Sequence, residues 1–197
     1  MVMARPRAGE ETGRQRLLDA AWSALEHTDG RTDRISVSSL CAAAHCTAPT
    51  LYHHFDDVPA LLYAAGQRAF AAWSNDMAAR VGAERDPALR LRRRARAYLD
   101  WAQANPRAYQ VLFGSFPAVA AAPTPGAGPG AGFLPLRDDV AALTGLPAED
   151  PAVIPVALAH WAAVHGIASL AIQTTQVPAG WWDTALDVLV EALLARR

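Results

Sequence analysis

The stretch SLCAAAHCTAPTLYHHF, residues 39–55, predicts two short helices joined by a tight turn. Ser36 or Ser38 is the expected N-cap of the first helix, because a serine side chain accepts hydrogen bonds from the first backbone N–H groups of a helix. Thr47 is the expected N-cap of the second helix, which is short and ends at His54. Two helices arranged in this way form a helix-turn-helix.

The second helix is expected to present small and polar side chains outward. Threonine and alanine methyl groups can meet the methyl group of thymine, and hydroxyl and imidazole groups suit phosphate oxygens. Side chains of these types could therefore contact double-stranded DNA. The candidate DNA-contacting residues are Ser36, Ser38, Thr47, Ala48, Pro49, Thr50, Tyr52, His53 and His54.

Two cysteines and three histidines in this stretch also raise the question of a metal or redox site. Thiolates and imidazoles are zinc ligands, but the spacing C-x3-H-C-x6-H-H matches no standard zinc pattern. A buried thiol that fills space suits Cys41 equally well. A disulfide between Cys41 and Cys46 would need the turn between them to distort. We predict no metal and no cofactor, and a redox- or metal-responsive regulator that uses Cys41 and Cys46 remains an alternative.

The longer segment ISVSSLCAAAHCTAPTLYHHFDDVPALL, residues 35–62, resembles the recognition segment of the tetracycline-repressor (TetR) family of bacterial transcription regulators. The resemblance runs from about Arg14 to Leu62, and LYHHF at 51–55 is its most specific part. It implies DNA recognition by the helix-turn-helix span from Ser36 to Phe55, with the helix Thr47–His54 in the major groove.

Three positions depart from the family's usual pattern. His45 stands where a glycine in a left-handed conformation is usual, Cys46 replaces a valine, and Val58 replaces a lysine that grips phosphate. The first 57 residues carry six arginines against eight acidic residues, and the whole chain has a net charge of −1. Non-specific affinity for DNA is therefore expected to be low, since that affinity comes from basic side chains.

The rest of the chain predicts helices and no strands, so the expected fold class is all-α. A three-helix N-terminal helix-turn-helix domain is expected at 13–73, and a larger helical bundle for ligand binding and dimerisation at 74–197. Residues 117–132 hold four prolines and four glycines and predict a loop. No apolar run reaches membrane-spanning length, and the start is polar and lacks a secretory signal. We expect a cytoplasmic protein with no membrane partner.

The C-terminal part carries aromatic and polar groups that suit a small-molecule pocket. The segments 95–114 and 160–170 resemble one subgroup of TetR-type domains, marked by Trp-x-x-x-His-Gly at Trp161, His165 and Gly166. Aromatic residues at helical spacing are also typical of plain core, so both interpretations stay open. The candidate pocket residues are Tyr63, Phe70, Trp73, Met77, Tyr98, Trp101, Tyr109, Phe113, Trp161 and His165.

The last two helices, expected at about 151–175 and 180–196, are rich in apolar residues. A helix that is apolar on more than one side needs more than one partner. We expect the two helices to pair with the same strip on a second copy of the chain. The candidate interface residues are Trp182, Leu186, Leu189, Val190 and Leu193.

Together these patterns predict a homodimeric regulator that binds a palindromic DNA operator and represses transcription until an unidentified small molecule binds. An enzyme is not expected, because Ser115 and Ser169 lack an obvious His and Asp set and no Gly-rich phosphate loop follows a strand. An all-α enzyme that uses its histidines is the remaining alternative.

Overall fold

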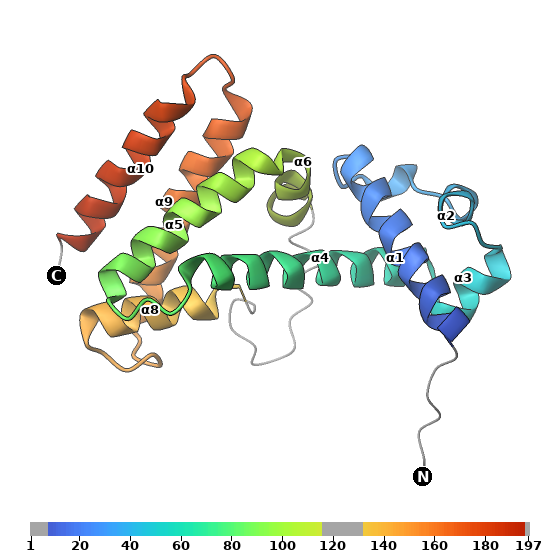
Figure 1. Cartoon of the computed structure of the whole chain (residues 1–197), viewed down its shortest axis with the longest axis horizontal. Helices are drawn as coiled ribbons and strands as arrows, with labels where there is room; N and C mark the ends of the chain where they lie inside the picture. Colours follow the sequence, from blue (N-terminus) through green and yellow to red (C-terminus); the bar gives the residue numbers. More distant parts are fainter. Residues whose placement is uncertain (1–7, 116–131, 196–197) are drawn as a thin grey trace, which may run out of the picture. The chain divides into compact units, whose positions relative to one another are not determined.

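The computed structural model describes residues 8–115 and 132–195, and within these ranges the chain forms helices and turns without strands (Figure 1). The predicted all-α fold class is confirmed. The described elements are α1 Ala8–His27, the 3-10 turn η1 Thr32–Arg34, α2 Val37–Ala43, α3 Ala48–His54, α4 Val58–Val81, α5 Pro87–Ala104, α6 Pro106–Tyr109, the π-helical η2 Gln110–Ser115, α8 Leu134–Thr144, α9 Val153–Gln173 and α10 Ala179–Leu194. Most of the predicted loop at 117–132 lies outside the described residues.

The chain separates into two compact units. Unit 1 consists of Met1–Ala71 and Arg107–Ala122, and unit 2 consists of Ala72–Pro106 and Pro123–Arg197. The long helix α4 contributes residues to both units, and the short segment after α5 returns to unit 1. The domain boundary predicted between residues 73 and 74 stays a prediction.

Unit 1 is built on the apolar stripe of α1. Leu17, Ala21 and Leu25 recur at intervals of four residues, which places them on one side of the helix, and all three are buried. The short helices α2 and α3 pack against this stripe and against each other. The buried residues that complete the core of unit 1 are Leu18, Ala20, Leu40, Cys41, Ala44, Leu51, Phe55, Leu61, Leu62, Ala65 and Val111.

Unit 2 is a bundle in which α5 packs against α8, α9 and α10, and α9 packs against α8 and α10. The helix α5 begins after Asp86, whose carboxylate accepts hydrogen bonds from the backbone N–H groups of Ala88 and Leu89. Pro87 follows in the first turn, where backbone N–H groups have no acceptor within the helix, so the missing N–H of proline costs no helical hydrogen bond. The core includes Leu91, Leu99, Val140, Val153, Ala157, Val164, Leu186 and Val190.

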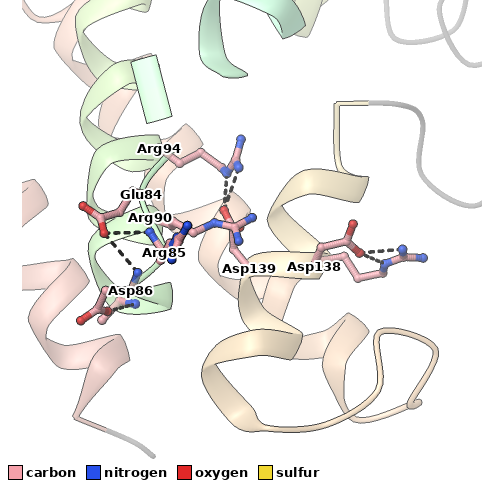
Figure 2. Close-up of polar contacts among 9 residues, drawn as sticks. Glu84, Arg85, Asp86, Arg90, Arg94, Asp138 and Asp139 are labelled. Atoms are coloured by element: carbon pink, nitrogen blue, oxygen red, sulfur yellow. Dashed lines mark hydrogen bonds and ion pairs between the residues drawn. The ribbon is translucent and has the colours of Figure 1, made fainter. Parts of the chain in front are cut away.

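A buried carboxylate ties α5 to α8 (Figure 2). Asp139 on α8 is fully buried, and its Oδ2 accepts hydrogen bonds from Nε of Arg94 at 2.8 Å and pairs with Nη2 at 2.7 Å. Arg90, one turn earlier on α5, forms an ion pair with Oδ1, although its geometry is not that of a hydrogen bond. Arg90 and Arg94 therefore have a structural role.

The expectation that no apolar run reaches membrane-spanning length is wrong for α9, which is the one described helix that is long and apolar enough to cross a membrane by length and composition. Val153, Ala157, Val164 and Ala168 are buried on one side of it, against the other helices of unit 2. It is a core helix of a helical bundle. Pro155 lies in its first turn, so the helix begins two residues before the proline.

Candidate nucleic-acid interface

The first helix of the helix-turn-helix begins at Ser36. Its hydroxyl oxygen accepts a hydrogen bond from the Ser39 backbone N–H at 3.1 Å, while the Ser36 backbone N–H donates to the Ser39 hydroxyl at 3.2 Å. The two bonds form a reciprocal capping box and satisfy N–H groups that the helix leaves unpaired. Of the two predicted N-caps, Ser36 is the one used, and Ser38 lies exposed inside the first turn.

The turn after α2 is a Schellman motif. The Cys46 N–H donates to the Cys41 carbonyl at 3.0 Å, and the His45 N–H donates to the Ala42 carbonyl at 3.3 Å. His45 has φ of 50°, the left-handed conformation that this motif requires after the helix end. A histidine occupies this position at some cost, since glycine adopts positive φ without a clash.

The second helix, α3, is held by its buried face. Leu51 is fully buried and Phe55 nearly so, and both belong to the core of unit 1. Thr47 is the N-cap residue by its extended backbone, yet its hydroxyl makes no capping bond. That hydroxyl lies 3.1 Å from the Thr50 hydroxyl instead. The two threonines therefore form a linked polar pair at the start of α3.

The predicted contact residues differ in exposure. Thr47, Pro49, Tyr52 and His53 are exposed, and the Tyr52 side chain is 53% exposed. Ala48, Thr50 and His54 are half-buried. An outward face of small, hydroxyl-bearing and aromatic side chains remains on α3 once Leu51 is turned inward.

His54 is the member of the set that also faces the protein. A Cβ atom added at Gly13 of α1 would lie 3.3 Å from His54 Nε2, so the imidazole packs close to the α1 backbone. Next to it, the Arg14 guanidinium lies 5.3 Å from the centre of the Phe55 ring, a cation–π contact. The sequence pattern did not signal this contact, because it joins residues 41 positions apart.

Exposed charges of both signs surround this helix pair. Arg14, Arg16, Arg31 and Arg34 are exposed, and Arg31 donates from Nε to the Thr28 carbonyl at 3.2 Å. The Asp57 carboxylate accepts a hydrogen bond from the Ala60 N–H at 2.7 Å and caps α4. The arginines supply the positive charge that a phosphate backbone requires.

The candidate pocket residues fall into both units. In unit 1, Phe113 lies 6.4 Å from Phe70 and 5.2 Å from Tyr109, measured between ring centres, and the half-buried Tyr63 belongs to the same unit. In unit 2, Trp73 lies 5.9 Å from Tyr98 and 6.4 Å from Trp101, with Met77 buried one turn further along α4.

Polar groups accompany the aromatic cluster of unit 2. The Tyr98 hydroxyl and His165 Nδ1 lie 2.9 Å apart in a hydrogen bond, and the Trp161 ring lies 6.0 Å from the His165 ring. Burial lowers the pKa of His165, so its imidazole favours the neutral form. The Trp161, His165 and Tyr98 side chains thus form one continuous group on α5 and α9.

His160, which precedes Trp161 on α9, is buried in unit 2. Burial, and secondarily the charge of Arg94, lowers its pKa to about 4. Its Nε2 atom has no hydrogen-bond partner among the described residues. A buried imidazole that is held neutral can accept or donate one more hydrogen bond.

A shallow depression elsewhere in unit 2 is lined mostly by charged residues. Its lining comes from α4, α5 and α10: Arg80, Arg92, Arg93, Arg96, Ala97, Asp100 and Asp187. Each of its four arginines pairs with a carboxylate, among them Arg93 with Glu84 at 2.8 Å and Arg96 with Asp187 at 2.9 Å. The positive charge is therefore balanced within the unit.

The apolar residues of α10 that were predicted to contact a second copy of the chain are only partly exposed. Leu186 and Val190 are 1% and 3% exposed, because they face the core of their own unit. Trp182, Leu189 and Leu193 are half-buried. The exposed apolar side chains of α9 and α10 lie elsewhere on these helices, at Val156, Leu158, Trp161, Leu170, Trp181 and Val188.

Residues 91–196 match the family described as tetracyclin repressor-like, C-terminal domain. No curated protein matches the sequence.

Solved structures share the fold at low sequence identity. A TetR-like transcriptional regulator from Rhodococcus sp. RHA1 is 21% identical, with a TM-score of 0.66 over 98% of this chain and 97% of that one. A TetR-family transcriptional regulator from Streptomyces coelicolor is 17% identical, with a TM-score of 0.65 over 93% and 98%. The multidrug binding protein EbrR, complexed with imidazole, is 24% identical, with a TM-score of 0.59 over 91% and 88%.

Proposed function

The chain belongs to the tetracycline-repressor-like family and is a DNA-binding transcriptional regulator, and we propose that it is a one-component repressor released from its operator by a small molecule. The observation that carries the proposal is the helix-turn-helix of unit 1, which buries Leu51 and Phe55 and leaves Thr47, Pro49 and Tyr52 exposed on α3. A recognition helix needs this division between a face that packs and a face that remains available to base edges.

On DNA, α3 would lie in the major groove. Thr47 and Thr50, linked through their hydroxyls, would meet base edges, since short side chains allow close approach. Tyr52 and the capping residue Ser36 would donate to phosphate oxygens and fix the position of the helix on the duplex. Arg31 and Arg34, exposed before α2, would add positive charge near the backbone.

The proposed active form is a homodimer. On α9, Val156, Ala159, Ala163, Gly166 and Leu170 recur at intervals of three and four residues, so they form a stripe on a different side of the helix from the buried residues. On α10, Trp181 and Val188 also lie opposite the buried Leu186 and Val190. Two copies paired through these stripes would be related by a two-fold axis, so the operator would be palindromic.

The proposed effector site is the aromatic group of unit 2. Trp73, Tyr98, Trp101 and Trp161 supply apolar surface, and the hydroxyl–imidazole pair of Tyr98 and His165 supplies the polar contacts that orient a small molecule. Release from DNA follows only if the effector binds the non-DNA conformation more tightly. The helix α4 offers a covalent route for such a change, since Trp73 and the core residues Leu61 and Leu62 lie on it.

A selection experiment tests the proposal. Full-length protein would be mixed with a pool of random duplexes, and bound DNA would be enriched and sequenced at several salt concentrations. We expect one inverted repeat to be enriched, and its affinity to fall as salt rises. An all-α enzyme would enrich no sequence, and that outcome would reject the regulator.

A further inference from the structure

The turn of the helix-turn-helix brings two thiols together. In a Schellman motif the side chain three positions before the helix cap touches the one two positions after it. In this chain these positions are Cys41 and Cys46, whose backbones share the 3.0 Å hydrogen bond that defines the motif. The contact is usually between two apolar side chains, but here it joins two thiols, both free.

The two thiols differ in their surroundings. Cys41 is buried in the core of unit 1, whereas Cys46 is half-buried at the edge of that core. Burial raises the pKa of Cys41, as do a hydrogen bond from its S–H to the Cys46 sulfur and the charge of Cys46. Cys41 therefore stays protonated, and Cys46 is the thiol that an oxidant reaches.

We propose that Cys41 and Cys46 are a redox-responsive dithiol that closes to a disulfide under hydrogen peroxide and thereby lowers the affinity of the helix-turn-helix for DNA. The regulatory half of this inference rests on the proposed function, whereas the thiol chemistry stands by itself.

The reaction balances in two steps. The Cys46 thiolate attacks one peroxide oxygen, the O–O bond breaks, and the departing hydroxide takes a proton to become water, leaving Cys46 as a sulfenic acid. The Cys41 sulfur then attacks the Cys46 sulfur, the S–O bond breaks, and the hydroxyl leaves as water with the Cys41 proton. Two thiols lose two electrons in total, and one peroxide becomes two water molecules.

The effect on DNA binding follows from where Cys46 lies. It directly precedes Thr47, the N-cap of α3, and one residue before it His45 already holds a left-handed backbone. A disulfide draws two sulfurs from contact distance to about 2.05 Å. Because Cys41 is fixed in the core, the movement falls on the turn and on the start of α3. The Thr47–Thr50 pair would then leave its position for base contact.

The first experiment measures the thiols of the reduced full-length protein after exposure to hydrogen peroxide. We expect a mass lower by two hydrogen atoms and the joint loss of alkylation at both cysteines. In Cys41→Ser, which cannot close the bond, dimedone should label Cys46. In Cys46→Val, which keeps an apolar side chain in the contact, Cys41 should resist labelling. Oxygen addition without a disulfide, or labelling of Cys41, would overturn the proposed chemistry.

The second experiment measures affinity for a duplex that the reduced protein has enriched from a random pool. Oxidation should lower the affinity by about tenfold or more, roughly 1.4 kcal/mol at least, and dithiothreitol should restore it. Cys46→Val should keep its affinity in peroxide. A disulfide that leaves binding unchanged, or an equal loss in Cys46→Val, would overturn the switch. If no duplex is enriched, the proposed regulator and the proposed redox control of DNA binding are both rejected. The mass measurement then tests only whether the disulfide forms.

Discussion

Two side chains of α3, Thr50 and Tyr52, are expected to make different kinds of contact with DNA. Thr50 is half-buried, and its hydroxyl is hydrogen-bonded to that of Thr47. Both residues lie at the start of α3, the part of the helix that we propose enters the groove. Tyr52 is 53% exposed and carries its hydroxyl at the end of a long ring. Short side chains near the helix start read base edges, and a longer donor reaches the backbone.

Thr50→Ala should therefore change which bases are preferred at one or two positions, with discrimination altered by about 1–3 kcal/mol. Tyr52→Phe should weaken binding to all sequences about equally, since a phosphate contact carries no base information. Sequencing the duplexes enriched by each variant measures both effects. If Tyr52→Phe shifted the preferred bases and Thr50→Ala left them unchanged, our placement of α3 in the groove would be wrong.

The buried His160 makes the stability of unit 2 depend on pH. Its pKa is about 4 in the folded chain against 6.5 for an ordinary histidine, because burial, and secondarily Arg94, disfavours the imidazolium. As pH falls below 6.5, His160 becomes protonated in the unfolded chain but stays neutral in the folded chain. The stabilisation is thus complete above pH 6.5 and is lost as pH falls toward 4.

We expect the free energy of unfolding to fall by up to about 1.4 kcal/mol per pH unit in this window from His160 alone. Urea unfolding at a series of pH values measures the slope. His160→Leu, an apolar substitution, should flatten the slope and leave the smaller part due to His165, whose pKa is lowered by burial as well. An unchanged slope in His160→Leu would assign the pH dependence to other groups.

At the scale of the element, one carboxylate joins two helices. Asp139 is fully buried on α8, and its partners Arg90 and Arg94 stand one turn apart on α5. Removing one partner of a buried ion pair leaves a charge without compensation, which costs more than the pair contributes. Arg94 would carry most of this cost, because its side chain is the less exposed of the two arginines.

Asp139→Asn should lower the free energy of unfolding by about 3 kcal/mol. The neighbouring Asp138→Asn is the matched control, since Asp138 is exposed and pairs with Arg137 beside it, and its effect should stay within about 0.5 kcal/mol. Thermal or urea unfolding of the two variants gives the comparison. Equal effects would mean that the α5–α8 contact does not depend on this carboxylate.

The elements differ in how far the sequence predicts them. Ser36 acts as a cap where the sequence predicts one, because capping depends on residues three positions apart or fewer. The partner of the α5 arginines could not be predicted, since Asp139 lies 45 residues from Arg94.

The candidate sites show the same limit. The outward face of α3 follows from its own short pattern, and only the contact of His54 with α1 depends on a distant residue. The exposed apolar side of α10 could not be predicted from the sequence, because α10 is apolar on two sides and periodicity alone does not say which side faces inward. The structure turns Leu186 and Val190 inward and leaves Trp181 and Val188 exposed.

For the whole molecule, the open question is what covers the exposed apolar residues of α9 and α10. Leu170 is 50% exposed and Val188 is 65% exposed, on helices whose other sides already have partners within unit 2. Ala159, Ala163 and Gly166 give the α9 stripe little side-chain bulk, and a Cβ at Gly166 would meet nothing within 4 Å. A neighbouring helix can therefore approach α9 closely. The same stripe on a second copy of the chain could pack against it and cover these apolar residues.

Leu170→Arg and Val188→Arg should each yield a monomer, because a buried, unpaired guanidinium at a two-fold interface is repeated on both sides. Light scattering should give the wild type twice the chain mass of 21.0 kDa and each variant the mass of one chain. Operator affinity should fall by a hundredfold or more, roughly 3 kcal/mol, since one half-site contact binds weakly without its linked partner. Leu89→Arg is the control, because Leu89 is 43% exposed on α5 and lies outside both stripes. A wild type that is monomeric at micromolar concentration and still binds an inverted repeat tightly would reject both the dimer and the symmetry expected of its operator.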